Sequence, residues 1–336
     1  MKVNNKKEKN FGIALLRVIL AFMVVVDHFY DSKKKNLLIL YYHIPTFFLL
    51  SFYFTNNYFT TYNIAKIKLR FERLIIPYLC WNIISWILSN IYFHLFNRKC
   101  KHSIYDFLHT LLNGHIFIPA LWFQNILILT TLIVSIIVFT FQNYCVLIFQ
   151  IIMILSYVFQ YSGMNNVFFR KHFKLFYYNT YGRMLETLPH SISGLFLATY
   201  NIPYKLRKHK FKTVIVSSFI LILATTSQID NQLLGFKYGG IRLNIAAICI
   251  FFIFFYSLFD KIQNKKIKNL IDNITNFTAG IYYSHYLIGK SFIMEFLLGR
   301  KIKTFFGILV IYSTTYFICF FLDKLIGNTK LKHLIK

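Results

Sequence analysis

The stretch FGIALLRVILAFMVVVDHFY, residues 11–30, decides how the rest of the chain is interpreted. Apart from Arg17, Asp27 and His28 it is almost wholly apolar, and a helix needs about 20 such residues to cross a bilayer. Lysines precede it, as in a secretory signal peptide, but no small-x-small cleavage site follows and charged residues interrupt the run. We therefore expect an uncleaved first membrane helix.

Apolar segments of similar length recur along the whole chain, which is 57% hydrophobic and only 15% charged. Soluble domains usually carry about 25% charged residues. We predict an all-α, polytopic integral membrane protein with about ten transmembrane helices and no extramembrane domain. A single domain is expected over residues 1–336, with tails at 1–10 and 327–336 and a helical core at 11–326. The ten expected spans are residues 11–30, 37–55, 74–96, 118–141, 144–161, 183–200, 211–229, 241–259, 274–295 and 304–326.

The charge is strongly basic, with 38 Lys and Arg against 11 Asp and Glu. These residues lie between apolar runs rather than on a soluble scaffold, which argues against nucleic-acid binding. Ten spans place both termini on one side, and that side carries the larger share of Lys and Arg. The positive-inside rule then predicts cytoplasmic termini. No His, Asp or Glu cluster has metal-ligand spacing, so no metal is expected.

Arg17 and His28 are the clearest candidates for chemistry, because ionisable residues inside a span are costly and are usually functional. Their separation of eleven residues is three helical turns plus about 20°, so both lie on one face, about 16 Å apart along the axis. That arrangement suits a long, thin ligand with an anionic head, such as acyl-coenzyme A. In the alternative, Arg17 extends to the lipid headgroups and His28 lies inertly at the membrane rim.

Arg70 and Arg73 precede the third expected span in the segment RFERLIIPY, residues 70–78. Residues three apart are neighbours on a helix surface, and guanidinium pairs suit phosphate groups. The pair is therefore a candidate anchor for coenzyme A phosphates. In the alternative it is ordinary basic flanking of a span.

Further polar and aromatic residues inside or beside the spans are expected to line a cavity. Glu186 and His190 lie one helical turn apart in an expected span. The other candidates are His43, Trp122 and His285.

Taken together and in this order, these segments resemble the membrane-bound acyltransferase 3 family. The resemblance covers nearly the whole chain. One departure is Phe52, where the family usually has Gly after Ser51, which puts a close helix approach there in doubt. The matching elements are Arg17 with His28, the segment from His43 to Ser51, Arg70 with Arg73, Leu74, Pro77 and Tyr78, the segment from Leu121 to Phe123, Gly194, and Ile281, Tyr282 and His285.

The resemblance implies a membrane O-acyltransferase of the short surface-polysaccharide O-acetyltransferase type. Such an enzyme moves an acyl group, most simply acetyl, from acyl-coenzyme A to a sugar hydroxyl of a surface polysaccharide or its lipid-linked precursor. His28 would then act as general base on that hydroxyl or carry the acyl group transiently. Arg17 would hold the donor or offset developing negative charge, and Arg70 and Arg73 would anchor the coenzyme A phosphates.

The same resemblance implies acetyl-coenzyme A as co-substrate, without a metal. The expected partners are a surface glycan or lipid-linked oligosaccharide and the lipid bilayer of a bacterial cytoplasmic membrane. The alternative function is a non-enzymatic transporter or flippase for a lipid-linked sugar. It explains the spans and the buried charges, but it does not explain why Arg17 and His28 occur together with the two arginines near the third span.

Overall fold

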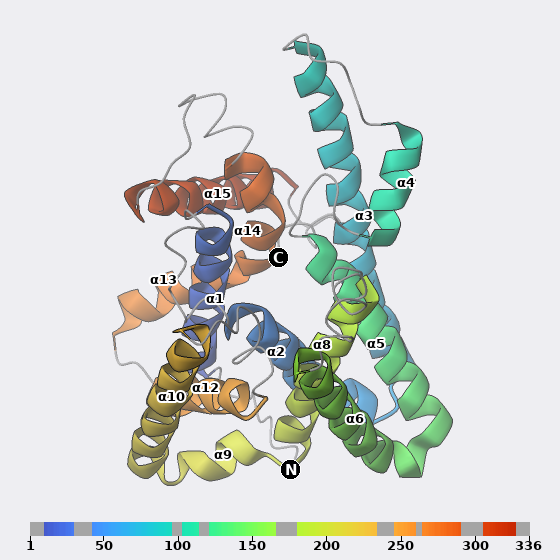
Figure 1. The fold of residues 1–336 in the computed structure, drawn as a ribbon. Helices are drawn as coiled ribbons and strands as arrows, with labels where there is room; N and C mark the ends of the chain where they lie inside the picture. Colours follow the sequence, from blue (N-terminus) through green and yellow to red (C-terminus); the bar gives the residue numbers. More distant parts are fainter. Residues whose placement is uncertain are drawn as a thin grey trace, which may run out of the picture.

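The computed structural model describes residues 10–29, 42–95, 103–113, 121–165, 180–233, 245–259, 264–289 and 305–326. Nearly all of them are helical and no strand occurs among them, so the predicted all-α fold is confirmed (Figure 1). In chain order the helices are α1 (Phe11–Phe29), α2 (His43–Thr60), α3 (Ile64–Leu95), α4 (Ile104–Asn113), α5 (Trp122–Phe141), η4 (Gln142–Tyr144), α6 (Cys145–Asn165), α8 (Thr180–Thr199), α9 (Ile202–Arg207), α10 (Lys210–Leu233), α12 (Ile245–Leu258), α13 (Lys265–Asn276), α14 (Thr278–Tyr286) and α15 (Phe305–Ile326).

Each of the ten predicted spans overlaps one of these helices. Length and hydropathy alone single out four segments of the described chain that could cross a membrane: Phe11–Phe29, Ile64–Ile91, Trp122–Ser156 and Phe306–Ile326. α12 is apolar but shorter. The membrane character of the chain is therefore supported, and the number of about ten spans stays a prediction.

The third helix begins earlier than the sequence predicted. α3 starts at Ile64 rather than near residue 74, and the side chain of Asn63 accepts a hydrogen bond from the backbone N–H of Lys66 in its first turn. Such a bond satisfies one of the N–H groups that a helix start leaves without a partner. Arg70 and Arg73 consequently lie inside the helix and not in a segment that leads into it.

The span predicted at residues 274–295 is broken at Phe277, where α13 ends and α14 begins. The hydroxyl of Thr278 donates to the carbonyl of Thr275 at 2.9 Å. Hydroxyl side chains that bond to nearby backbone in this way compete with a continuous helix. α13 is therefore a separate helix, with exposed lysines in its first turns, and the site-bearing helix α14 starts afresh.

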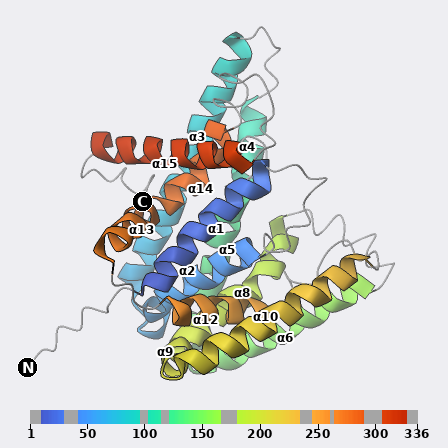
Figure 2. The ribbon, with the colours of Figure 1, turned by 90° about the vertical axis from the view of Figure 1, so that its left-hand side faces the viewer.

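Two clusters of buried apolar side chains form the core. The first joins α1, α12 and α15, and the second joins α3, α5 and α8. α2 and α14 contribute residues to both clusters, as do α1, through Val24, and α8, through Leu197. α14 packs beside α1, and α15 crosses this pair near the end of α1 (Figures 1 and 2).

At Gly194 the backbones of α2 and α8 lie closer together than a side chain at that position would allow. A methyl group added at Gly194 of α8 would lie 2.2 Å from the carbonyl oxygen of Leu49 and 3.1 Å from the backbone nitrogen of Tyr53. Only a residue without Cβ lets two helix backbones approach this far. The close approach of α2 that the sequence left in doubt at Phe52 thus occurs at the neighbouring residues Leu49 and Tyr53, against Gly194.

Replacing Gly194 by Ala should therefore destabilise the protein, because the new methyl group meets backbone that cannot move aside. We expect a loss of about 1–3 kcal/mol, typical of overpacked cores, measured by thermal unfolding of the purified protein in detergent. Thr199→Ala in the same helix is the matched control, since it removes only an exposed hydrogen bond to Asn56. Equal stability of the two variants would show that the α2–α8 contact is looser than described.

Candidate active site

Arg17 and His28 both meet α14. The guanidinium of Arg17 donates to the hydroxyl of Thr278 at 3.0 Å, at the start of α14. The imidazole of His28 lies 5.1 Å from that of His285 and 5.6 Å from the ring of Tyr286, measured between ring centroids at the end of α14. α1 and α14 thus run side by side, with one polar contact at Arg17 and a second near the end of α1.

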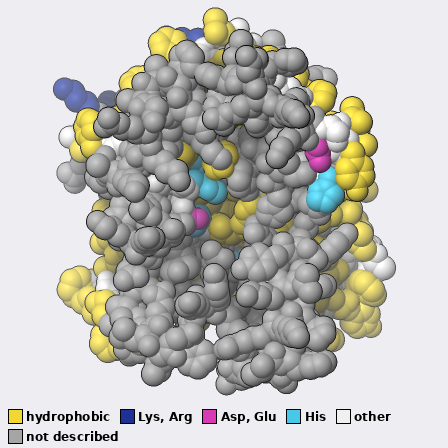
Figure 3. All heavy atoms as spheres, turned by 45° about the horizontal axis from the view of Figure 1, so that its top comes forward, with side chains coloured by type: hydrophobic (Ala, Val, Ile, Leu, Met, Phe, Trp, Pro, Cys, Tyr) yellow, Lys and Arg dark blue, Asp and Glu magenta, His cyan; other side chains and the backbone are white. Residues whose placement is uncertain are grey.

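His285 is wholly buried at the centre of this second contact. Its Nδ1 lies 3.0 Å from the carbonyl oxygen of Ile281, and the rings of Phe29 and Tyr282 pack around it. In the space-filling view of Figure 3, histidine and acidic side chains show in a hollow near the centre of the face. His285, expected only to line a cavity, is therefore part of the same group as His28.

Hydrogen bonds to α5 and α3 fix the position of α14. The hydroxyl of Tyr283 donates to Oε1 of Gln124 at 2.9 Å, and Nε2 of Gln124 donates to the carbonyl of Leu74 at 2.9 Å. That carbonyl lies one turn before Pro77, whose missing N–H and ring disturb the backbone bonding of the preceding turn. The carbonyl that Pro77 leaves without an N–H is that of Arg73, four residues earlier, and Gln124 donates to the carbonyl of the neighbouring residue Leu74.

Thr278 and Gln124 were not among the residues predicted from the sequence. Gln124 was detectable as a buried amide in an otherwise apolar run, because such a group has to find partners inside the protein. Thr278 carried no such signal, since a threonine can bond within its own helix.

The two arginines of α3 lie in different surroundings, and the expectation that both anchor coenzyme A phosphates stays a prediction. Arg70 is buried and points into the protein, whereas Arg73 is exposed. Arg70 donates four hydrogen bonds, to the carbonyl and hydroxyl of Ser51 and to the hydroxyls of Thr55 and Thr131. It therefore ties α3 to α2 and α5.

Phe52 has a role in this network. It is fully buried, and the guanidinium carbon of Arg70 lies 4.6 Å from its ring centroid. A cation over an aromatic face is attracted by the ring electrons, most strongly where water is excluded. The residue that departs from the family pattern thus supports the buried charge of Arg70.

The remaining predicted residues occupy different surroundings. His43 is buried at the start of α2, and Trp122 is half-buried at the start of α5. Their helices contribute Phe47 and Phe123, which pack against Tyr282 of α14 at centroid distances of 6.0 and 5.0 Å. These two helix starts therefore lie beside the histidine-bearing helix.

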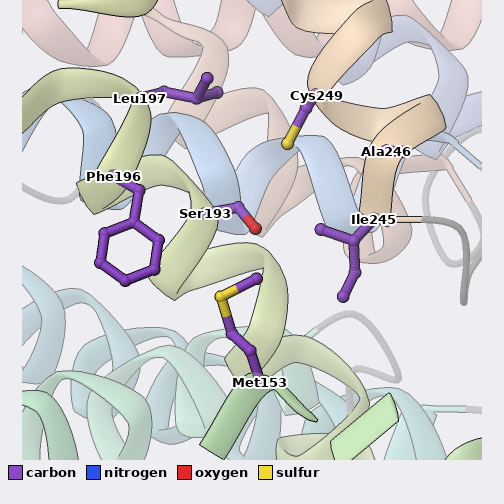
Figure 4. A pocket seen from close by; sticks show the side chains of 7 residues that line it. All are labelled: Met153, Ser193, Phe196, Leu197, Ile245, Ala246 and Cys249. Atoms are coloured by element: carbon purple, nitrogen blue, oxygen red, sulfur yellow. The ribbon is translucent and has the colours of Figure 1, made fainter. Parts of the chain in front are cut away.

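The pair predicted in α8 is only partly described. His190 is buried in α8, and the side chain of Glu186 falls outside the described residues. His190 is not among the residues that line the cavity of about 440 Å³ between α6, α8 and α12, into which Ser193 and Cys249 project (Figure 4). The other residues that line this apolar cavity are Met153, Phe196, Leu197, Ile245 and Ala246. Within the described segments, no group of three or more His, Cys, Asp or Glu side chains could hold a metal ion.

A comparison with protein families identifies the family of this chain. The model of an acyltransferase domain, that of the acyltransferase 3 family, matches residues 10–324. The chain belongs to the acyltransferase 3 family. No curated protein and no solved structure matches it. This acyltransferase 3 protein is therefore a helical membrane acyltransferase, and the polar contacts between α1 and α14 lie within the matched domain.

The network around Arg70 predicts that this residue matters for stability. Replacement of Arg70 by Met removes four charge-assisted hydrogen bonds and leaves the Ser51, Thr55 and Thr131 oxygens to find other donors. A hydrogen bond to a charged group contributes about 1.5–3 kcal/mol, and removing the buried guanidinium offsets part of that loss, so the variant should unfold at a lower temperature in detergent. Arg73→Met, at an exposed position of the same helix, is the control and should unfold like the wild type. Similar unfolding of both variants would mean that the Arg70 network contributes little.

Proposed function

We propose that this membrane acyltransferase moves an acetyl group from acetyl-coenzyme A to a sugar hydroxyl of a surface polysaccharide or its lipid-linked precursor. The observation that carries the proposal is the pairing of α1 with α14, which joins Arg17 and His28 to one buried helix. A half-buried cation and an imidazole farther along the same helix suit transfer from an anionic thioester to a hydroxyl, because the cation can hold the anionic donor and the imidazole can take the hydroxyl proton. The polysaccharide acceptor follows from the resemblance to short surface-polysaccharide O-acetyltransferases.

Arg17 supports the donor side of the proposal. A guanidinium has five N–H donors, and within the described chain Arg17 contacts a single acceptor, the Thr278 hydroxyl. A cation held among apolar helices with donors to spare is suited to an anionic ligand, because pairing offsets the cost of its burial. Arg17 lies about 16 Å along α1 from His28, which leaves room for an extended donor whose thioester reaches the imidazole.

In this proposal the acceptor hydroxyl binds beside His28, which acts as the general base. A neutral imidazole nitrogen takes the proton of the sugar hydroxyl while the oxygen attacks the thioester carbonyl carbon. The tetrahedral intermediate then collapses, the carbon–sulfur bond breaks, and the imidazolium returns the proton to the leaving sulfur. Transient transfer of the acetyl group to His28 itself is the alternative route to the same products.

The two arginines of α3 divide between two roles in this proposal. Arg70 keeps α2, α3 and α5 together through its four hydrogen bonds. Arg73 is exposed and remains available to contact coenzyme A phosphates. We place this helix end, with both chain termini, on the cytoplasmic side of a bacterial inner membrane, where coenzyme A is found.

Acceptor-dependent release of coenzyme A thiol tests the function. Purified protein in lipid nanodiscs is mixed with acetyl-coenzyme A and a lipid-linked oligosaccharide acceptor, and free thiol is followed together with the mass of the acceptor. Acetylated acceptor and free thiol in equal amounts are expected. A transporter of lipid-linked sugars would release no thiol, so that outcome would overturn the proposal.

His28→Ala should abolish this transfer in a protein that folds and inserts normally. Loss of a general base typically lowers the rate by 10²–10⁴-fold, and loss of an acyl carrier would lower it further. The measurement is acetylated acceptor formed at equal protein amounts. His209→Ala, at the exposed turn between α9 and α10, is the control and should be fully active. Activity of the His28 variant above about a tenth of the wild type would move the base to His43 or His285.

A further inference from the structure

The hydrogen bonding of His285 determines which of its ring nitrogens carries the proton. Nδ1 lies 3.0 Å from the carbonyl oxygen of Ile281. A carbonyl can only accept, so Nδ1 carries the hydrogen, and Nε2 of the neutral ring presents a lone pair. The tautomer of His285 is thus set by its own helix.

That lone pair is buried and unused. Nε2 of His285 has no hydrogen-bond partner within the described parts of the chain, and the residue is 0% exposed. A buried acceptor without a partner costs about 1–3 kcal/mol. Groups of this kind in native proteins call for an explanation, and a catalytic role is one of them.

The surroundings of His285 show which group the lone pair can serve. Three aromatic rings from α1 and α14 pack on it, and His28 is the nearest, with a centroid distance of 5.1 Å against 6.1 Å for Tyr282 and 6.2 Å for Phe29. Asp27 also interacts with His285 electrostatically. From α15, Cys319 reaches this part of α14 through Ser284, at 3.7 Å from its hydroxyl.

We propose that His285 is a positioning residue whose Nε2 accepts a hydrogen bond from His28 during acetyl transfer. The inference rests on the proposed function, in which His28 takes the hydroxyl proton. When one nitrogen of His28 takes that proton, the N–H on its other nitrogen donates to Nε2 of His285. Hydrogen bonds of this kind are often long in the ligand-free protein and tighten only with substrate bound.

His285 neither gains nor loses a proton in this scheme. The proton moves from the sugar hydroxyl to His28 and on to the leaving sulfur, and His285 only holds the imidazole in place. In many enzymes a carboxylate orients the imidazole that serves as general base. His285 would orient His28 in the same way, without bringing a negative charge into the membrane. The Ile281 carbonyl fixes His285, and the hydrogen bonds from Tyr283 to Gln124 and from Arg17 to Thr278 fix the helix that carries both.

Two substitutions of His285 separate this role from simple packing. Gln can present an amide oxygen near the place of Nε2, whereas Leu fills the space and offers no acceptor. A role in positioning His28 predicts that His285→Leu lowers kcat by about tenfold to a hundredfold, the usual cost of losing such a support, with KM for acetyl-coenzyme A unchanged. His285→Gln should retain more of the activity.

A packing role predicts the opposite order, because Leu suits a buried apolar site better than an amide does. Equal or greater activity of His285→Leu would overturn the proposal, as would a change confined to KM. His209→Leu, at an exposed position, is the matched control.

A measurement that needs no activity tests the same contact. Solid-state NMR of protein with ¹⁵N-labelled histidine, in nanodiscs at a pH that protonates His28, should show a proton shared between ring nitrogens of His28 and His285. His285→Gln and His28→Ala should each remove that signal. Its absence from the wild type would overturn the inference even if acetyl transfer is observed. Its presence without transfer would establish the contact between His28 and His285 and refute the proposed function.

Discussion

In the interior of a bilayer no water is at hand to satisfy a polar group, so each such group has to find its partner within the protein. The hydrogen bond from Arg17 to Thr278 is the contact on which the rest of the site depends. It holds the start of α14 against the middle of α1. Because α14 then runs beside α1, the ring of His285 lies next to that of His28. One pairing of helices therefore places a cation and two imidazoles along a single line.

A second set of polar contacts holds the other helices to this pair. Gln124 links Tyr283 of α14 to the backbone of α3 before Pro77, and Arg70 joins α2, α3 and α5. Each contact joins segments far apart in the chain and lies in apolar surroundings, where a lost hydrogen bond is not replaced by water. Such contacts give the packing a definite register that apolar side chains alone would leave open.

The sequence was a good guide to the helices and a poorer one to their contacts. The length of the apolar runs predicted the helices, and the order of short motifs predicted the family. The break at Phe277 was missed because an apolar run does not reveal a threonine that bonds to its own backbone. The inward direction of Arg70 was missed as well. Its partners lie on α2 and α5, and helix-flanking position alone cannot separate a buried arginine from the exposed Arg73.

The contact between Gly194 and the backbone of Leu49 has a mechanical consequence. Two helices that touch through backbone cannot slide past each other without first moving apart, so α2 and α8 behave as one rigid body. The two apolar clusters meet along α1, α2, α8 and α14, which contribute to both. A movement that admits a bulky acceptor would have to part the helices along that boundary. His28 on α1 and His285 on α14 lie on helices at that boundary. The distance between their two imidazole rings would therefore report how far the protein has opened.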